Sequence, residues 1–331
     1  MKRILVTGGA GFIGSNIAGA LADADKHPIA VSDHFGSDDK WRNLSNHQIF
    51  EFVRPDDTFY WLQDHGHELE AIIHMGAVSS TTETDVDLIL DNNFSLSKAL
   101  WDWCTENEVR LIYASSAATY GAGEAGFEDG YALATLKRLK PLNPYGWSKH
   151  IFDQFVAQAV ARGQKTPPQW VGLKFFNVYG PNEYHKGSQK SVSNQIFPHA
   201  MHGRPVHLFK SYNPKYKDGE QLRDFIYVKD CVDVVQWLLD NPQVSGLFNL
   251  GTGKARSFAD LAKAVFSALN LETRINFIDM PETLKNKYQY FTQAEMGRLH
   301  AAGYTKPFTS LEDGTRDYVQ NYLAQEEDPY F

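Results

Sequence analysis

The feature that most constrains the fold is a cluster of glycines close to the N-terminus. A short apolar run, residues 3–7, leads directly into Gly-Gly-Ala-Gly-Phe-Ile-Gly at residues 8–14. Between a strand and a helix, Gly8 permits a tight turn, Gly11 lets the backbone approach a pyrophosphate, and Gly14 lets helix and strand pack closely. Because a helix N-terminus also offers free N–H donors to phosphate, the sequence predicts a dinucleotide-binding strand–turn–helix unit.

The following residues alternate strand-like runs with segments of helical period. The predicted strands are 3–7, 29–32, 71–74, 111–115 and 171–176; the predicted helices start at Ser15 or span 92–104 and 144–161. Such alternation is typical of an α/β fold with a Rossmann-like, doubly wound parallel sheet. We expect a dinucleotide-binding domain over 1–176, with a returning segment at about 224–250. A smaller, discontinuous α/β domain that binds mainly substrate is expected over 177–331.

Beyond about Pro181 the pattern is looser. The stretch 211–221 has neither period and is predicted to be a loop, either a surface insertion or a substrate lid. Two Ser/Thr and acid pairs predict helix N-caps there, Ser257 with Asp260 and Thr292 with Glu295.

Composition excludes several classes of protein. With 40 acidic against 32 basic residues the net charge is −8, so nothing favours a nucleic-acid partner. Two cysteines and scattered histidines suggest neither a disulfide framework nor a metal site. No run reaches the roughly 18 apolar residues of a membrane helix. We expect a cytoplasmic protein without metal or membrane partner.

The choice between NAD and NADP stays open from the residues alone. Asp33 ends the second strand, where a carboxylate can accept hydrogen bonds from the adenosine ribose and favour NAD. Lys40 and Arg54 follow and could instead neutralise the 2′-phosphate of NADP, or be solvated surface charges.

A Ser, Tyr and Lys set predicts the reacting groups. Tyr145 and Lys149 lie four residues apart at the start of a predicted helix, so both side chains emerge from one face. Ser116 ends a predicted strand, at the edge where open α/β sheets bind ligands. A free phenol has a pKa of about 10, and this pKa must fall by about three units for the phenol to act as a base at neutral pH. We expect Lys149 and a positively charged nicotinamide ring to lower the Tyr145 pKa, Lys149 to hold the nicotinamide ribose, and Ser116 to polarise the sugar.

With these residues in place, the chain resembles the ADP-L-glycero-D-manno-heptose 6-epimerases over nearly its whole length. The segments that carry the resemblance are 8–16, 74–82, 91–93, 175–181, 183–188, 223–225 and 288–293. The resemblance implies conversion of ADP-D-glycero-D-manno-heptose to its L-glycero isomer, a lipopolysaccharide core precursor of Gram-negative bacteria. It also implies tightly held NADP, no net redox change, and a homo-oligomer, often a pentamer.

The resemblance further assigns residues to roles. Tyr145 matches the family's catalytic tyrosine, Ser116 its serine, Lys149 its cofactor lysine, and Lys186 a second acid/base group. Dinucleotide contacts fall on Gly8, Gly11, Phe12, Ile13, Gly14, Asp33, His34, Lys40, Arg54, Met75, Gly76, Ala77, Val78, Ser79, Asn92, Lys149, Val178 and Lys186. Substrate contacts fall on Ser116, Asn177, Ser188, Gln195, Phe209, Lys210, Ser211, Tyr212, Arg223 and Tyr288. The chain departs from the pattern at Met75, where the family often has an acid, at Gln195, where a His is common, and in longer segments after Gly121 and around 212–221.

Inverting a carbon needs either an intermediate that turns or a second proton-transfer group, because one base reaches one face only. We expect Lys186 to be that second group. A nucleotide-sugar 4,6-dehydratase is the nearest enzymatic alternative, beside other nucleotide-sugar epimerases. It would need an acid next to Ser116, where this chain has Ala117 and Ala118. A catalytically silent dinucleotide sensor is an alternative of another class, and it would not need Ser116, Tyr145 and Lys149 together.

Overall fold

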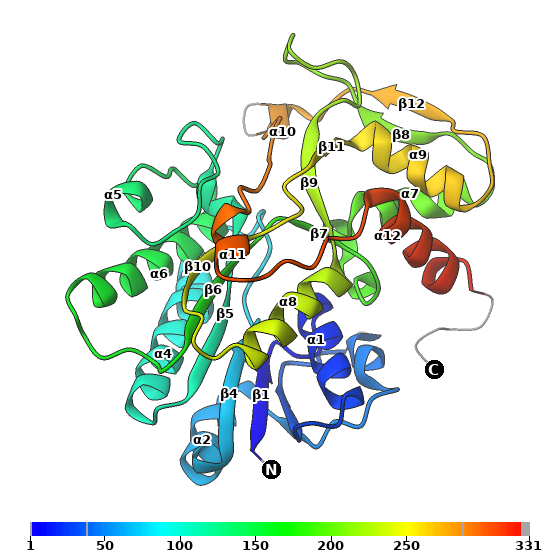
Figure 1. The fold of residues 1–331 in the computed structure, drawn as a ribbon. Helices are drawn as coiled ribbons and strands as arrows, with labels where there is room; N and C mark the ends of the chain where they lie inside the picture. The colour runs from blue at the N-terminus through cyan, green and yellow to red at the C-terminus, as the bar shows by residue number, and fades with distance from the viewer. Residues whose placement is uncertain (1, 38, 286–287, 326–331) are drawn as a thin grey trace.

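Seven parallel strands form the main sheet of the computed structural model, which describes residues 2–37, 39–285 and 288–325 (Figure 1). The strands are β1 (Arg3–Thr7), β2 (Ile29–Ser32), β3 (Glu51–Val53), β4 (Leu69–His74), β5 (Arg110–Ser116), β6 (Trp170–Phe175) and β10 (Gly246–Leu250). Their order is β10-β6-β5-β4-β1-β2-β3, and every neighbouring pair is parallel. The predicted doubly wound parallel sheet is confirmed.

Helices cover both faces of this sheet. In Figure 1, α4 (Leu96–Glu106) and α6 (Pro144–Ala161) lie on one side of the strands, and α1 (Phe12–Asp23) and α8 (Val228–Asp240) on the other. Strands covered on both faces are apolar along most of their length, and Ile4, Leu5 and Val6 of β1 are all fully buried. The continuous apolar runs in the sequence therefore follow from this layering.

The direction of winding reverses between β1 and β4. The chain runs outward from β1 to β2 and β3, then returns to place β4 on the other side of β1. Ligands of open α/β sheets bind outside the carboxyl ends of the strands at such a point. The glycine loop follows β1 there, and β4 and β5 end beside it at His74 and Ser116.

The C-terminal residues build a smaller lobe at the upper right of Figure 1. Its strands are β7 (Asn177–Tyr179), β8 (Val206–Phe209), β9 (Leu222–Tyr227), β11 (Ala255–Ser257) and β12 (Ile275–Ile278), and its longer helices are α7 (Val192–Ala200), α9 (Phe258–Ala268) and α12 (Leu311–Tyr318). They form a three-stranded sheet, β11-β9-β7, and a two-stranded sheet, β12-β8. Side chains of α7, α9 and β8 make a separate apolar core that includes Phe197, Leu208 and Phe266.

Short elements complete the description. The short helices are α2 (Thr58–His65), α3 (Val86–Leu90), α5 (Leu133–Leu136), α10 (Glu282–Lys285) and α11 (Gly297–Ala301). No helix in the described ranges is long and apolar enough to cross a bilayer. Nor do those residues contain a group of three or more His, Cys, Asp or Glu arranged to hold a metal ion.

Several predicted boundaries need correction. The first helix begins at Phe12, before Ser15, because the turn of the glycine loop already feeds into it. The single helix predicted over 92–104 is a longer assembly of α3, a wide π turn at Asp91–Ser95, and α4.

The two predicted N-caps have different outcomes. Ser257 and Asp260 form the predicted capping box at the start of α9. Thr292 is not a cap, because its hydroxyl accepts the backbone N–H of Asp224 at 3.2 Å and α11 begins only at Gly297. The stretch 211–221 contains neither helix nor strand, as predicted.

Candidate functional site

The glycine loop has the geometry that a bound pyrophosphate needs. Gly8 has φ of 64°, and a Cβ there would lie 2.5 Å from the backbone nitrogen of Gly76. A Cβ on Gly14 would lie 2.1 Å from the carbonyl oxygen of Gly8, so only glycine permits the contact between α1 and the turn. The N-cap of α1, Gly11, makes no side-chain cap. The first N–H groups of the helix are thus left to an anion, and the residues present fit a dinucleotide.

Asp33 folds onto this loop. One oxygen of its carboxylate accepts the N–H groups of Ala10 and Gly11 at 2.9 and 3.1 Å, and the other pairs with the Lys40 ammonium at 2.6 Å. Lys40 also donates to the carbonyl of His34 at 3.0 Å, while the Arg54 side chain is 79% exposed and lies 3.8 Å from Asp56. The carboxylate expected to meet the ribose therefore also shapes the loop.

The segment after β4, residues 75–79, is held at Val78 by a residue to which the sequence assigned no role. The Asn93 amide accepts the N–H of Val78 at 2.8 Å, donates to the Val78 carbonyl at 3.0 Å, and donates to Ser148 of α6 at 3.0 Å. Asn92, the predicted dinucleotide contact, donates within its own helix to Leu88. The only sequence signal for the contact between Asn93 and Val78 was the Asn92–Asn93 pair inside a segment of helical period.

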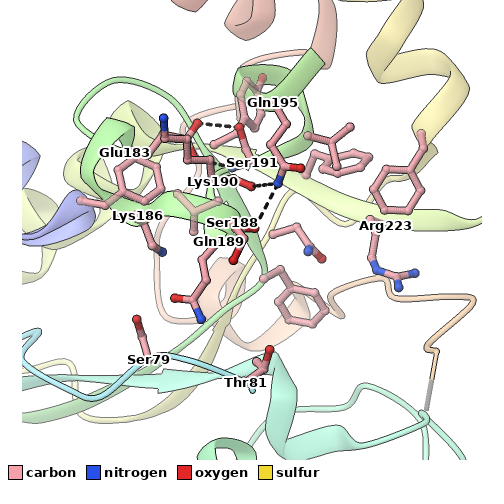
Figure 2. Close-up of a pocket in the computed structure, with 18 of the residues that line it drawn as sticks. Ser79, Thr81, Glu183, Lys186, Ser188, Gln189, Lys190, Ser191, Gln195 and Arg223 are labelled. Carbon is pink, nitrogen blue, oxygen red and sulfur yellow. Dashed lines mark hydrogen bonds between the residues drawn. The ribbon is translucent and has the colours of Figure 1, made fainter. Parts of the chain in front are cut away.

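A cleft of about 840 Å³ follows the carboxyl ends of β5 and β6 and reaches the smaller lobe. The predicted site residues that line it are Phe12, Ile13, Ser79, Ser116, Tyr145, Asn177, Val178, Lys186, Ser188, Gln195, Phe209, Arg223 and Tyr288. Figure 2 shows the part of this cleft around Lys186 and Arg223. Lys210, Ser211 and Tyr212 are not among the lining residues; Lys210 and Tyr212 both bond to Asp279.

The start of α6 places Tyr145 at the cleft. Asn143 caps the helix by accepting the N–H of Gly146 at 2.8 Å. A Cβ on Gly146 would lie 2.7 Å from the carbonyl of Ala118, so this glycine lets α6 approach the residues just after Ser116. Burial raises the pKa of the Tyr145 phenol, and a hydrogen bond with Ser116 opposes the rise. The expected lowering of this pKa is therefore wrong for the protein groups around the phenol.

Lys149 lies buried one turn further along α6. Burial lowers the pKa of its ammonium to about 8, and Asp153 opposes the shift. His74 is also buried, and its burial together with the charge of Lys149 lowers the His74 pKa to about 3. His74 is therefore neutral and bonds to Thr7 at 2.6 Å and Ser97 at 2.9 Å, which ties β1, β4 and α4 together behind the lysine.

Lys186 enters the cleft from the smaller lobe. It lies in a 3-10 segment, Tyr184–Gln189, and its ammonium stands 5.5 Å from the centre of the Phe12 ring at the start of α1. Burial lowers the pKa of Lys186, and the charge of Glu183 opposes that shift. Ser116, Tyr145 and Lys186 thus converge on one cleft from β5, α6 and the segment after β7.

Arg223 of β9 is a buried cation suited to an anion. Its guanidinium carbon lies 5.5 Å from the Phe258 ring centre and 5.3 Å from that of Tyr288. One N–H donates to the carbonyl of Leu222 at 2.8 Å. No carboxylate pairs with Arg223 in the part of the chain that the structure describes. A planar fork without an acidic partner can grip a diphosphate.

The chain is similar over nearly its whole length to known proteins. Over 98% of its length the chain is 47% identical to ADP-L-glycero-D-manno-heptose-6-epimerase of Fusobacterium nucleatum, covering 99% of that protein. It is 49% identical to the protein of the same name from Nitratidesulfovibrio vulgaris, covering 97% and 98% of the two chains. The crystal structure of the Helicobacter pylori ADP-L-glycero-D-manno-heptose-6-epimerase superposes with a TM-score of 0.77 at 30% identity, covering 96% of this chain and 95% of that one. Residues 4–251 match the model of the NAD dependent epimerase/dehydratase family, and the chain belongs to that family.

Proposed function

We propose that this chain is an ADP-glycero-manno-heptose 6-epimerase. It would invert C6 of ADP-D-glycero-D-manno-heptose to the L-glycero form, a step toward the lipopolysaccharide core, by transient oxidation and re-reduction with bound NADP. One observation carries the proposal: Ser116, Tyr145 and Lys186 line a single cleft, in a chain similar over 97–98% of its length to relatives of that name.

Two proton-transfer groups suit an inversion better than one. One of Tyr145 and Lys186 would take the proton of the C6 hydroxyl, and the other would return a proton after the sugar has turned. Ser116, which bonds to Tyr145, would polarise the C6 oxygen. The bound dinucleotide would supply the temporary store for the hydride of C6. Lys149, buried one turn further along α6, would hold the nicotinamide ribose.

The surroundings of Asp33 support NADP over NAD. Both carboxylate oxygens are already engaged, by two loop N–H groups and by Lys40. Hence Asp33 is less available to ribose hydroxyls. Lys40 and the exposed Arg54 would supply positive charge to a 2′-phosphate.

The remaining assignments follow the same division. Residues 75–79, pinned by Asn93, would contact the dinucleotide together with Phe12, Ile13 and Val178. Asn177, Ser188, Gln195, Phe209 and Tyr288 would contact the substrate, with Arg223 on its diphosphate, and 210–212 would approach only from outside the lining of the cleft. We propose further that 1–176 and the returning segment at about 224–250 bind the dinucleotide, that 177–331 binds mainly substrate, and that the protein works as a homo-oligomer.

The direct test uses purified protein without added cofactor. Incubation with ADP-D-glycero-D-manno-heptose should invert C6, as followed by NMR or by chromatography of the two isomers. The dinucleotide released on denaturation should carry the additional phosphate of NADP. Loss of water from the sugar would indicate a dehydratase instead, and binding without turnover would indicate a sensor.

Replacing Arg223 by methionine should weaken substrate binding much more than turnover. The change keeps most of the packing between Phe258 and Tyr288 but removes the cation. Charge-assisted bonds contribute roughly 1.5–3 kcal/mol, so KM should rise about 10- to 100-fold with kcat less affected. Steady-state kinetics measure both constants.

Lys263→Met is the matched control, because Lys263 of α9 does not line the cleft and its ammonium lies 3.7 Å from the Asp260 carboxylate. Its KM should stay close to that of the wild type. An equal rise of KM in both variants would mean that general surface charge, rather than Arg223, attracts the diphosphate.

A further inference from the structure

Glu183 is an unexpected residue in a cleft that must receive an anionic diphosphate. It is the one carboxylate among the described residues that line the cleft, and its side chain is buried, with an exposed fraction of 1% for the residue. A carboxylate there repels the substrate and costs free energy to desolvate. Its contacts must therefore offset this cost.

The carboxylate closes the loop that carries Lys186. One oxygen of Glu183 accepts the backbone N–H of Ser191 at 2.5 Å, and the other accepts the Ser191 hydroxyl at 2.5 Å. A further hydrogen bond involves Tyr318 of α12. Figure 2 shows Glu183 and Ser191 joined across the base of the loop, with Lys186 on the segment between them. Because Glu183 precedes residues 184–190 and Ser191 follows them, one side chain fixes both ends of the loop.

Among the side chains that line the cleft, Glu183 is the one whose charge acts on Lys186, although the two groups do not form a direct ion pair. The other titratable side chains lining the cleft are Tyr145 of α6, Tyr179 of β7, Lys190, His207 of β8, Arg223 of β9 and Tyr288. None of these carries a negative charge at neutral pH unless a tyrosine ionises. The side chain of α1 that lies against the ammonium is the uncharged Phe12 ring. Glu183 accepts every hydrogen bond with Ser191, as an ionised carboxylate does.

We propose that Glu183 is a positioning residue for Lys186: it ties the loop shut and sets the charge of the ammonium in the cleft. The inference rests on the proposed function only where Lys186 acts as an acid or base; the tie between Glu183 and Ser191 does not require it. Glu183 thereby makes up for the burial of a group that must change its protonation state. The two effects on the Lys186 pKa are opposite, because burial lowers this pKa and the charge of Glu183 raises it.

Glu183→Gln tests the effect of the Glu183 charge on Lys186 without substrate. The amide keeps the size, and its one oxygen can still accept one of the two hydrogen bonds from Ser191, but the charge is removed, so the Lys186 pKa should fall further. We expect the midpoint of Lys186 acetylation by acetic anhydride, followed against pH by peptide mass spectrometry, to move down by about one pH unit. In the dependence of kcat on pH, the limb that reports Lys186 should move down by the same amount. An unshifted acetylation midpoint in folded Glu183→Gln would overturn the inference.

Two further variants separate charge from loop closure. Ser191→Ala removes a hydrogen bond to Glu183 but keeps its charge, so the acetylation midpoint should stay at the wild-type pH; an equal shift there would mean that loop geometry alone acts.

If Glu183→Gln does not fold, Lys186→Met gives the reciprocal result. Without the ammonium the already raised pKa of Glu183 rises further, so Lys186→Met should lose stability relative to wild type as the pH increases from 5 to 8. A pH-independent difference would contradict an effect of one charge on the other. Since acetylation needs no turnover, a wild type that fails to epimerise leaves this test intact.

Discussion

Replacing Tyr145 by phenylalanine is expected to lower kcat by about 10²–10⁴-fold, the usual contribution of a positioned acid or base. The change removes one oxygen and leaves the ring at the cleft. It also removes the hydrogen bond between Ser116 and the phenol, although the Ser116 hydroxyl oxygen still accepts the N–H of Ala118 at 3.1 Å. Isomer conversion under saturating substrate gives the measurement.

The control for this variant is Tyr304→Phe, which removes a buried hydroxyl outside the cleft. The Tyr304 hydroxyl has no hydrogen-bond partner among the described residues, and the ring packs on Trp237. Activity and dinucleotide content should therefore match the wild type. If Tyr145→Phe binds the dinucleotide normally and still converts substrate within tenfold of the wild type, the phenol is not the proton-transfer group.

The parts of the site that could be predicted from sequence are those whose geometry is local. A left-handed turn at Gly8 and a close packing contact at Gly14 each demand glycine at a fixed distance from a strand end. The spacing of Tyr145 and Lys149 likewise places both side chains on one helical face. In each case neighbouring residues on the chain determine the conformation, so the pattern is sufficient.

The contacts that could not be predicted join residues far apart in the chain. Asn93 fixes the backbone of Val78, but the sequence gives equal reason to assign Asn92. Glu183 stands inside a recognisable motif, yet its role depends on Ser191 returning to it after the loop. The direction of the Tyr145 pKa shift also depends on burial, which only the assembled fold determines.

A buried ion pair beneath the reacting groups is the clearest case of such a long-range contact. Lys174 of β6 pairs with Asp153 of α6 at 2.6 Å, and their side chains are 1% and 0% exposed. The same Asp153 oxygen accepts the Ser115 hydroxyl at 2.7 Å, while Lys174 donates to Thr119 at 2.7 Å. Ser115 and Thr119 flank Ser116 on either side, so the pair joins the strand end that carries the serine to the helix that carries Tyr145 and Lys149.

Lys174→Met should therefore destabilise the fold by about 3–5 kcal/mol, because it leaves the Asp153 carboxylate buried without a partner cation. Unfolding should reach its midpoint at a lower denaturant concentration than in the wild type. The fraction that remains folded should also have a lower kcat than the wild type, since the Ser116 end of β5 loses its tie to α6.

The double variant Asp153→Asn/Lys174→Met separates the unpaired charge from the lost packing. The asparagine carbonyl can still accept the Ser115 hydroxyl, so much of the lost stability should return while the tie through Lys174 to Thr119 stays broken. If the double variant is no more stable than Lys174→Met, the cost lies in the missing side-chain volume. A Lys174→Met protein as stable as the wild type would mean that the pair offsets its own desolvation and adds no net stability, which leaves alignment of Ser116 with Tyr145 as its remaining contribution.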